Sequence, residues 1–459
     1  MKIIFENLGP IKKGEIELNK LNIFCGRNNE GKTYINYLIY TILTTVNSLN
    51  FKKSKDFIKE LPKEKKEIKI SLEEVLFKEN YLKEILLNIE EKVVERLPII
   101  FSVSKDFFKD FKIKVEYESI NLSKRIYPKK FFGIGEHYGI IEKDGINIKI
   151  RFDEEFKNEI GEIFDLNFDT LKNQSSEIER INRIITNYII AMIFNLKRVY
   201  SFPAERSGLA IFYNELLIRR NNILDSFIRE NRDEESLKEI VSRYPKPIND
   251  YINFLSQIPR MMDRKIRRVN KVAQLAKDIE KDLLYGEYKV KDNKKIIYTT
   301  EDGKELELYT SSSLVKTAVG IINYLKYYAI KGDYFLIDEP ELNLHPENQR
   351  KIARIFARMI NYGINIVMTT HSPYIINELN NLIMLNKVSD TDKERIMNNN
   401  GIVKDSVIKV KDISAYLVNN HKIEEINKGE YGLEVESFNE TVDNLNNLSD
   451  DIYSSIEDW

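Results

Sequence analysis

The feature that most constrains the fold is a glycine-bounded loop near the start of the chain. The run Leu21 to Cys25 is apolar and typical of a β-strand. Eight residues follow it directly: Gly26-Arg27-Asn28-Asn29-Glu30-Gly31-Lys32-Thr33. The next segment, Tyr34 to Leu43, lacks Gly and Pro and is apolar on most faces, which predicts a buried helix. Strand, loop and helix thus follow in the order that a phosphate-binding P-loop requires.

The residue types of this loop suit the binding of nucleotide phosphates. Glycines let backbone N–H groups turn toward phosphate oxygens, a lysine reaches the β- and γ-phosphates, and a hydroxyl residue binds Mg²⁺. Gly26, Gly31, Lys32 and Thr33 supply these groups. All eight loop residues are therefore predicted to bind ATP, with Thr33 as a Mg²⁺ ligand. The alternative is a degenerate loop that binds no nucleotide.

A second apolar strand, Tyr334 to Ile337, delivers two consecutive carboxylates, Asp338 and Glu339. Ligands of parallel α/β sheets bind at the carboxyl ends of the strands. Asp338 is predicted to hold Mg²⁺, and Glu339 to orient or deprotonate the attacking water, because phosphoryl transfer depends on positioning and electrostatics. A solvated acidic turn is the alternative.

A histidine follows the next strand-like run, Ile364 to Met368. The run ends in Thr369-Thr370-His371-Ser372-Pro373. Because His371 emerges one βα unit after the two carboxylates, we expect it beside the γ-phosphate, in a functional rather than a structural role. Of the four histidines in the chain, His137 and His421 are assigned to surface or packing roles.

The alternation of strand-like and helix-like segments predicts an α/β fold with a mixed, largely parallel sheet. An ATPase head is expected in two parts, residues 1–207 and 286–459. Lys- and Glu-rich amphipathic helices are expected at about 50–95, and a helical insertion at 208–285, broken at Tyr244 to Pro247 and by Pro259. The β-like runs between 112 and 152 are expected to extend the core sheet. The tail from about 405 is interpreted as a small closing element or a docking segment.

Composition limits the classes of partner. The 459 residues carry 71 Lys and Arg against 72 Asp and Glu, so no overall field draws the chain to nucleic acid. A single cysteine, Cys25, excludes an internal disulfide and a cysteine-based zinc cluster. No apolar stretch approaches the roughly 20 residues that a membrane span needs, and no export signal is recognised. A cytoplasmic protein without membrane contact is expected.

One segment is locally basic. It holds Arg260, Arg264, Lys265, Arg267, Arg268 and Lys271 on a predicted helix. Such a run is able to bind DNA phosphates. A solvated basic face, or docking to an acidic partner, is the alternative.

The motifs together carry a family resemblance. The P-loop, the Thr370-His371-Ser372-Pro373 element and the run Asp338-Glu339-Pro340-Glu341-Leu342-Asn343-Leu344-His345-Pro346 resemble the ABC-type ATPase heads of the SMC, RecF-like and OLD-like group. The resemblance implies a head-to-tail dimer that closes around two ATP molecules. It also implies that Leu344 to Pro346 fall in a D-loop that meets the partner subunit, and that His371 is a switch histidine that senses the γ-phosphate.

In such dimers a signature segment precedes the strand with the two carboxylates. The candidate is Thr310-Ser311-Ser312-Ser313, before a helix-like segment, with Ser312 donating to the γ-phosphate from the helix N-terminus. Members of the group usually carry glycine where this chain has Ser313, which leaves ATP-driven dimerisation and turnover open. A simple serine N-cap is the alternative.

Two further segments are compared with the group. The segment Ser201 to Ser207 resembles one in defence-associated members, where Arg206 is expected to reach phosphate or a partner, or to pair with Glu205. Asp390-Thr391-Asp392 has the spacing of a TOPRIM metal site, but it lies in a charged, loop-like stretch, so no TOPRIM domain is expected.

The main functional hypothesis is an ABC-type ATPase that dimerises around ATP and Mg²⁺ and regulates a separate effector, expected to be a nuclease. The biological part rests on resemblance to stand-alone ATPase subunits of anti-phage systems of the Septu and PARIS types. One alternative is a RecF- or SMC-like DNA-repair ATPase that binds DNA directly. Another is a scaffold that binds ATP and hydrolyses little of it.

Overall fold

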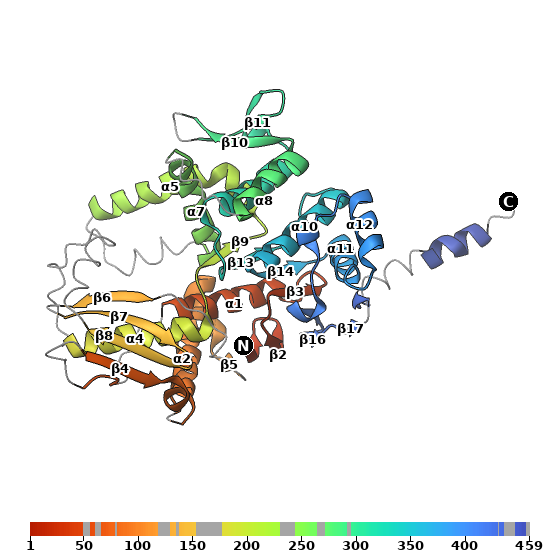
Figure 1. The fold of residues 1–459 in the computed structure, drawn as a ribbon. Helices are drawn as coiled ribbons and strands as arrows, with labels where there is room; N and C mark the ends of the chain where they lie inside the picture. The colour runs from red at the N-terminus through yellow and green to blue at the C-terminus, as the bar shows by residue number, and fades with distance from the viewer. Residues whose placement is uncertain are drawn as a thin grey trace. The chain divides into compact units, whose positions relative to one another are not determined.

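The computed structural model describes residues 1–48, 56–59, 66–78, 80–117, 129–134, 137–152, 177–229, 244–263, 271–291, 295–429, 431–435 and 446–455. The chain divides into two compact units. Unit 1 comprises Met1–Lys2, Ile42–Val93 and Lys114–Lys197. Unit 2 comprises Ile3–Thr41, Val94–Ile113 and Arg198–Trp459. Figure 1 traces their helices and strands along the chain.

Most of a nine-stranded sheet lies in unit 2. Its strands are β1 (Lys2–Leu8), β2 (Ile11–Glu17), β3 (Leu21–Gly26), β5 (Lys112–Glu116), β9 (Val199–Phe202), β13 (Tyr334–Asp338), β14 (Asn365–Thr370), β15 (Ile413–Asn419) and β16 (Lys422–Glu425). Their order across the sheet is β5-β1-β2-β16-β15-β3-β14-β13-β9. The five strands from β15 to β9 pair in parallel, and β16 pairs antiparallel with β15. The predicted α/β class with a mixed sheet is thereby confirmed.

The parallel register brings three chain segments to one edge of this sheet. Thr370 pairs with Cys25 between β14 and β3, and Asp338 pairs with Thr369 between β13 and β14. All residues of β3 are buried, as expected for a strand covered on both faces. Segments far apart in the sequence, β3 in red and β14 in blue, therefore lie side by side (Figure 1).

Helices of unit 2 cover the sheet and include the predicted 208–285 segment. They are α5 (Arg206–Arg229), α7 (Lys246–Asp263), α8 (Lys271–Ile279), α9 (Ser313–Asn323), α10 (Pro346–Tyr362), α11 (Pro373–Met384) and α12 (Asp390–Asn399). Pro259 lies inside α7 and does not break it, contrary to the prediction. Tyr251 of α7 packs on Phe202 of β9, with ring centroids 5.1 Å apart. These helices therefore belong to the same hydrophobic core as the sheet.

A small antiparallel sheet follows the helical segment. Its strands are β10 (Gly286–Val290), β11 (Ile296–Thr300) and β12 (Glu305–Glu307). A turn at Glu301-Asp302-Gly303 joins β11 to β12: Gly303 has φ +81°, and its N–H donates to the Thr300 carbonyl.

Unit 1 has a separate four-stranded sheet. Its order is β4-β8-β7-β6, formed by β4 (Lys66–Ser71), β6 (Lys130–Ile134), β7 (His137–Asp144) and β8 (Asn147–Phe152). The expectation that the runs between 112 and 152 extend the core sheet is wrong except for β5. Residues 66–71 were expected to be helical, yet Ile70 pairs with Ile148 in this sheet. Their alternation of charged residues and Ile has the period of a strand.

Helices α1 (Lys32–Asn47) and α2 (Tyr81–Phe101) each begin in one unit and end in the other, and α4 (Glu177–Phe194) lies in unit 1. Ile85, Ile89 and Val93 of α2 are fully buried, whereas Leu87 and Val94 are exposed. Helix α2 is therefore amphipathic, as predicted for part of 50–95. Residues 50–55, 60–65 and 79 of that range lie outside the described chain.

Two interpretations of the C-terminal part need correction. The tail supplies β15, a central strand whose Val418 pairs with Gly26, so it does more than close the fold. Asp390 to Asp392 form the start of α12 rather than a loop, because the Ser389 side chain caps that helix. His421 is exposed, in agreement with the expected surface role, and its Nδ1 lies 2.8 Å from the Pro10 carbonyl oxygen.

Candidate functional site

The glycine-bounded loop leaves β3 at Gly26 and enters α1 at Lys32. Gly26 has φ +143°, and a Cβ placed there would lie 2.1 Å from the Val418 carbonyl oxygen. Gly31 has φ +102° at the other end of the loop. Both positions thus require glycine because of their positive φ. Gly26 requires it also because β15 passes against the loop.

Lys32 is 6% exposed and lies across the loop. Its Nζ donates to the carbonyl oxygens of Gly26 at 3.1 Å and Arg27 at 2.7 Å. Burial lowers the pKa of Lys32, and the neighbouring carboxylates, Glu339 first, oppose that shift. An ammonium group has three donors, so one remains for a phosphate oxygen.

Asp338 ends β13 and is 2% exposed. Asn36 Nδ2 donates to its Oδ1 at 2.7 Å, and Thr369 Oγ1 donates to the same oxygen at 2.9 Å. Burial raises the pKa of Asp338 to about 6, although both hydrogen bonds act in the opposite direction. Hydrogen bonds from α1 and from the neighbouring strand β14 thus hold the Asp338 carboxylate in place.

Glu339 adopts a left-handed backbone conformation, with φ +44°. Its N–H donates to the Thr369 carbonyl oxygen and to Thr369 Oγ1, each at 3.1 Å. Its Oε1 lies 3.5 Å from His371 Nε2, and the two side chains are 30% and 29% exposed. The neighbouring His371 side chain holds the pKa of Glu339 below its usual range. An ionised carboxylate is therefore presented to solvent at the sheet edge.

His371 is fixed through its backbone. Its N–H donates to Glu341 Oε1 at 2.5 Å, and Thr370 Oγ1 donates to the same oxygen at 2.9 Å. Burial raises the pKa of Glu341. The residues after β14 are therefore tied to the loop that follows the two carboxylates.

A second link joins the same two loops. Ser372 Oγ donates to Gln349 Oε1 at 2.5 Å, and Gln349 Nε2 donates to the Leu344 carbonyl oxygen at 2.8 Å. These two hydrogen bonds join the segment that carries His371 to the loop at Leu344.

Arg206 occupies a place that the sequence did not indicate. It is 1% exposed, and its Nη1 and Nη2 donate to the carbonyl oxygens of Asp338 at 2.7 Å and Glu339 at 2.9 Å. Burial lowers the pKa of the guanidinium. The expectation that Arg206 reaches phosphate or pairs with Glu205 is wrong, because the side chain is enclosed and its bonds go to backbone carbonyls.

Ser312 and Ser313 lie at the N-terminus of α9, where both are exposed. Ser312 is the N-cap residue, and its hydroxyl accepts from the Val315 N–H at 3.3 Å. The N-cap alternative is confirmed, while a role in a composite site stays a prediction. His345, in the predicted D-loop, is exposed and caps α10 in the same way, accepting from the Glu347 N–H.

Sequence reasoning missed Asn36, Thr369 and Glu341 as parts of the site. Asn36 carries a weak signal, since it lies four residues after Lys32 in an otherwise apolar helical run. Most of the basic run cannot be placed: residues 264–270 lie outside the described chain, although Arg260 is exposed on α7.

The residues at this edge of the sheet fit a Mg²⁺ ion that is also held by the phosphates of a substrate. Among the described residues no group of three or more His, Cys, Asp or Glu side chains is arranged to hold a metal by itself. Mg²⁺ is commonly held by one or two protein ligands and by substrate phosphates. Thr33, exposed in the first turn of α1, and Asp338 are the residues available for such sharing.

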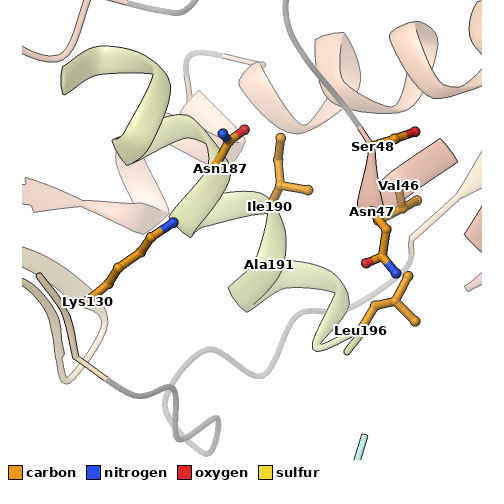
Figure 2. Close-up of a pocket in the computed structure, with 8 residues that line it drawn as sticks. All are labelled: Val46, Asn47, Ser48, Lys130, Asn187, Ile190, Ala191 and Leu196. Atoms are coloured by element: carbon orange, nitrogen blue, oxygen red, sulfur yellow. The ribbon is translucent and has the colours of Figure 1, made fainter. Parts of the chain in front are cut away.

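A pocket of about 430 Å³ lies within unit 1. It is lined by Val46, Asn47, Ser48, Lys130, Asn187, Ile190, Ala191 and Leu196 (Figure 2). None of the lining residues is a carboxylate, a histidine or a cysteine, and Lys130 is the one charged side chain among them. Across the residues that the structure describes, no helix combines the length and apolar character needed to cross a membrane.

Comparison with known proteins places the site in a family. The model of the AAA ATPase domain matches residues 1–376. No curated protein sequence matches the chain.

Similar solved structures include two SMC head domains. The head with an extended coiled coil from Pyrococcus furiosus, bound to the C-terminal domain of ScpA, is 13% identical with a TM-score of 0.34, over 97% of this chain and 98% of that one. The head from Thermotoga maritima is 8% identical with a TM-score of 0.30, over 95% and 98% of the two chains. Similarity at this level supports no inference about partners.

Proposed function

Since the chain belongs to the AAA ATPase domain family and is a P-loop ATPase, we propose that it hydrolyses ATP in a two-copy assembly that regulates a separate effector. The effector is proposed to be a nuclease of a cytoplasmic anti-phage system. The observation that carries the chemical part is the pair formed by Glu339 and His371, which lie 3.5 Å apart with side chains that are 30% and 29% exposed.

Each group at the sheet edge has a proposed role in hydrolysis. The loop N–H groups and Lys32 bind the β- and γ-phosphates of ATP, and Thr33 and Asp338 would hold Mg²⁺. When bound, Mg²⁺ supplies positive charge against the phosphate oxygens. Glu339 accepts a proton from the water that attacks the γ-phosphorus, and the bond to the leaving ADP oxygen breaks. His371 donates a hydrogen bond to the γ-phosphate.

Exposed residues support the two-copy assembly. Ser312, at the N-terminus of α9, and His345, at the start of α10, are both open to solvent. A helix N-terminus attracts anions through its N–H groups and its dipole. In the proposed dimer, Ser312 of one copy therefore meets the γ-phosphate bound by the other copy.

Light scattering coupled to size exclusion tests this assembly. With ATP and Mg²⁺, the Glu339→Gln variant is expected to run as a dimer, because bound nucleotide is not consumed. The double variant Lys32→Ala, Glu339→Gln should remain in the nucleotide-free state. A monomer of Glu339→Gln at saturating ATP would contradict the proposal.

Direct DNA binding is the second candidate, favoured by the basic run from Arg260 to Lys271. Neutralising phosphates releases counterions, so such binding weakens steeply with salt. Salt-dependent DNA binding by the isolated chain, lost on replacing Arg264, Arg267 and Arg268 with Ala, would favour it over the effector role. Absence of binding at low salt would remove it.

A further inference from the structure

We propose that Arg206 is a positioning residue for ATP hydrolysis, which holds the backbone of Asp338 and Glu339 so that the Glu339 carboxylate stays beside His371. This inference rests on the role proposed above for Glu339. Arg206 has no contact with substrate in this account and acts only through the two residues whose carbonyls it binds.

The guanidinium binds two consecutive carbonyls. Arg206 Nη1 donates to the Asp338 oxygen at 2.7 Å and Nη2 to the Glu339 oxygen at 2.9 Å, while Nη1 also lies 3.3 Å from the Pro203 oxygen. The planar fork of an arginine presents donors in a fixed geometry, which a lysine does not reproduce. The end of β13 is thereby attached to the start of α5.

The turn at Glu339 needs such a restraint. A left-handed conformation is unfavourable for a residue other than glycine, and it persists only when the surroundings determine it. Thr369 holds the Glu339 N–H from one side, and Arg206 holds the flanking carbonyls from the other. If the peptide turned, the carboxylate would leave its place 3.5 Å from His371.

A purely structural role does not account for an arginine at position 206. The side chain is 1% exposed, and its Nε–H has no hydrogen-bond acceptor among the described residues. A buried charge without full pairing destabilises a protein, and an apolar side chain would anchor α5 at lower cost. An apolar side chain, however, cannot donate to both carbonyls.

The test compares Arg206→Met and Arg206→Lys in the full chain. Both variants should bind ATP with a Kd close to that of the unaltered chain, because the P-loop is unchanged. Misplacement of a catalytic group by about 1 Å costs on the order of 100-fold in rate, so kcat should fall roughly 10- to 100-fold in Arg206→Met. Arg206→Lys should recover part of this loss, since one ammonium still reaches one carbonyl.

Arg198→Lys is the matched control. Arg198 also bridges a carbonyl and a carboxylate of unit 2, those of Tyr328 and Asp333, before β13 begins. Its replacement should change thermal stability without changing kcat of the folded protein. Unchanged kcat in Arg206→Met, or an equal loss of kcat in Arg198→Lys, would overturn the positioning role.

Combining Arg206→Met with Glu339→Gln separates the two proposals. If Arg206 acts through Glu339, the double variant should be no slower than Glu339→Gln alone. A further loss on top of Glu339→Gln would contradict the inference. Undiminished turnover in Glu339→Gln itself would instead contradict the role of Glu339 on which the inference rests.

Discussion

Thr369 Oγ1 donates a hydrogen bond to Asp338 Oδ1 over 2.9 Å, which ties the strand before His371 to the strand that ends in the two carboxylates. The same hydroxyl accepts the N–H of Glu339. One side chain thus fixes both the proposed metal ligand and the proposed catalytic carboxylate relative to the switch segment.

Replacement of Thr369 by Val is expected to raise the Mg²⁺ concentration needed for half-maximal ATPase activity several-fold. The variant keeps the shape of the side chain but leaves Asp338 Oδ1 with one donor fewer in a buried place, where a hydrogen bond to a charged group contributes about 1.5–3 kcal/mol. A Mg²⁺ titration of ATPase activity measures the effect.

Thr317→Val is the control for this titration. Thr317 is 2% exposed on α9, and its hydroxyl has no hydrogen-bond partner among the described residues. The control should leave the Mg²⁺ dependence unchanged. An equal shift in both variants, or none in Thr369→Val, would argue against the role assigned to Thr369.

Replacement of Gly26 by Ala is expected to abolish ATP binding and lower the melting temperature. The new Cβ would lie 2.1 Å from the Val418 carbonyl oxygen at a φ of +143°, so either the loop or β15 must move. Nucleotide titration and thermal melting measure both effects. In Gly208→Ala, at a helical position with nothing within 4 Å of the added Cβ, binding should be retained and stability should rise by up to about 1 kcal/mol. Retained binding in Gly26→Ala would contradict the loop geometry.

Replacement of Lys326 by Met is expected to destabilise unit 2 by about 3–5 kcal/mol at neutral pH, because it leaves Glu280 buried without its partner. Lys326 Nζ lies 2.5 Å from Glu280 Oε1. Burial raises the pKa of Glu280 and Lys326 opposes that shift, so the pKa should rise further in the variant.

The sign of the pH dependence follows from this shift. A carboxyl whose pKa is higher in the folded than in the unfolded state contributes stability at low pH, and loses it as pH rises through the folded pKa. The deficit of Lys326→Met should therefore be larger at pH 8 than at pH 5 in denaturant unfolding. Lys304→Met, which alters an exposed pair with Asp302, should change little. A deficit independent of pH would contradict the assignment to Glu280.

The segments of the site could be found from sequence because each is encoded locally. An apolar strand followed by Gly26 to Thr33, by Asp338-Glu339 or by His371 is visible in a short window. Parallel pairing then brings the strand ends to one edge, which the register of β3, β14 and β13 bears out.

The residues that hold the site in place could not be predicted from the sequence, because their hydrogen bonds join segments that are far apart in the chain. Arg206 donates a hydrogen bond to the Asp338 carbonyl, 132 residues away in the sequence. Asn36 donates to the Asp338 carboxylate, 302 residues away. The residues around Arg206 in the sequence do not indicate whether its side chain binds phosphate or donates to backbone carbonyls. For the same reason β15 was underestimated, since its place beside β3 depends on pairing with a strand at the other end of the chain.

The central claim is that Glu339 carries the hydrolytic step, and ATP turnover by Glu339→Gln tests it most directly. A positioned general base contributes on the order of 100- to 10,000-fold, so kcat should fall by at least about 100-fold while the Kd for ATP stays close to that of the unaltered chain. Turnover within a few-fold of the unaltered chain, with ATP bound equally well, would contradict the account.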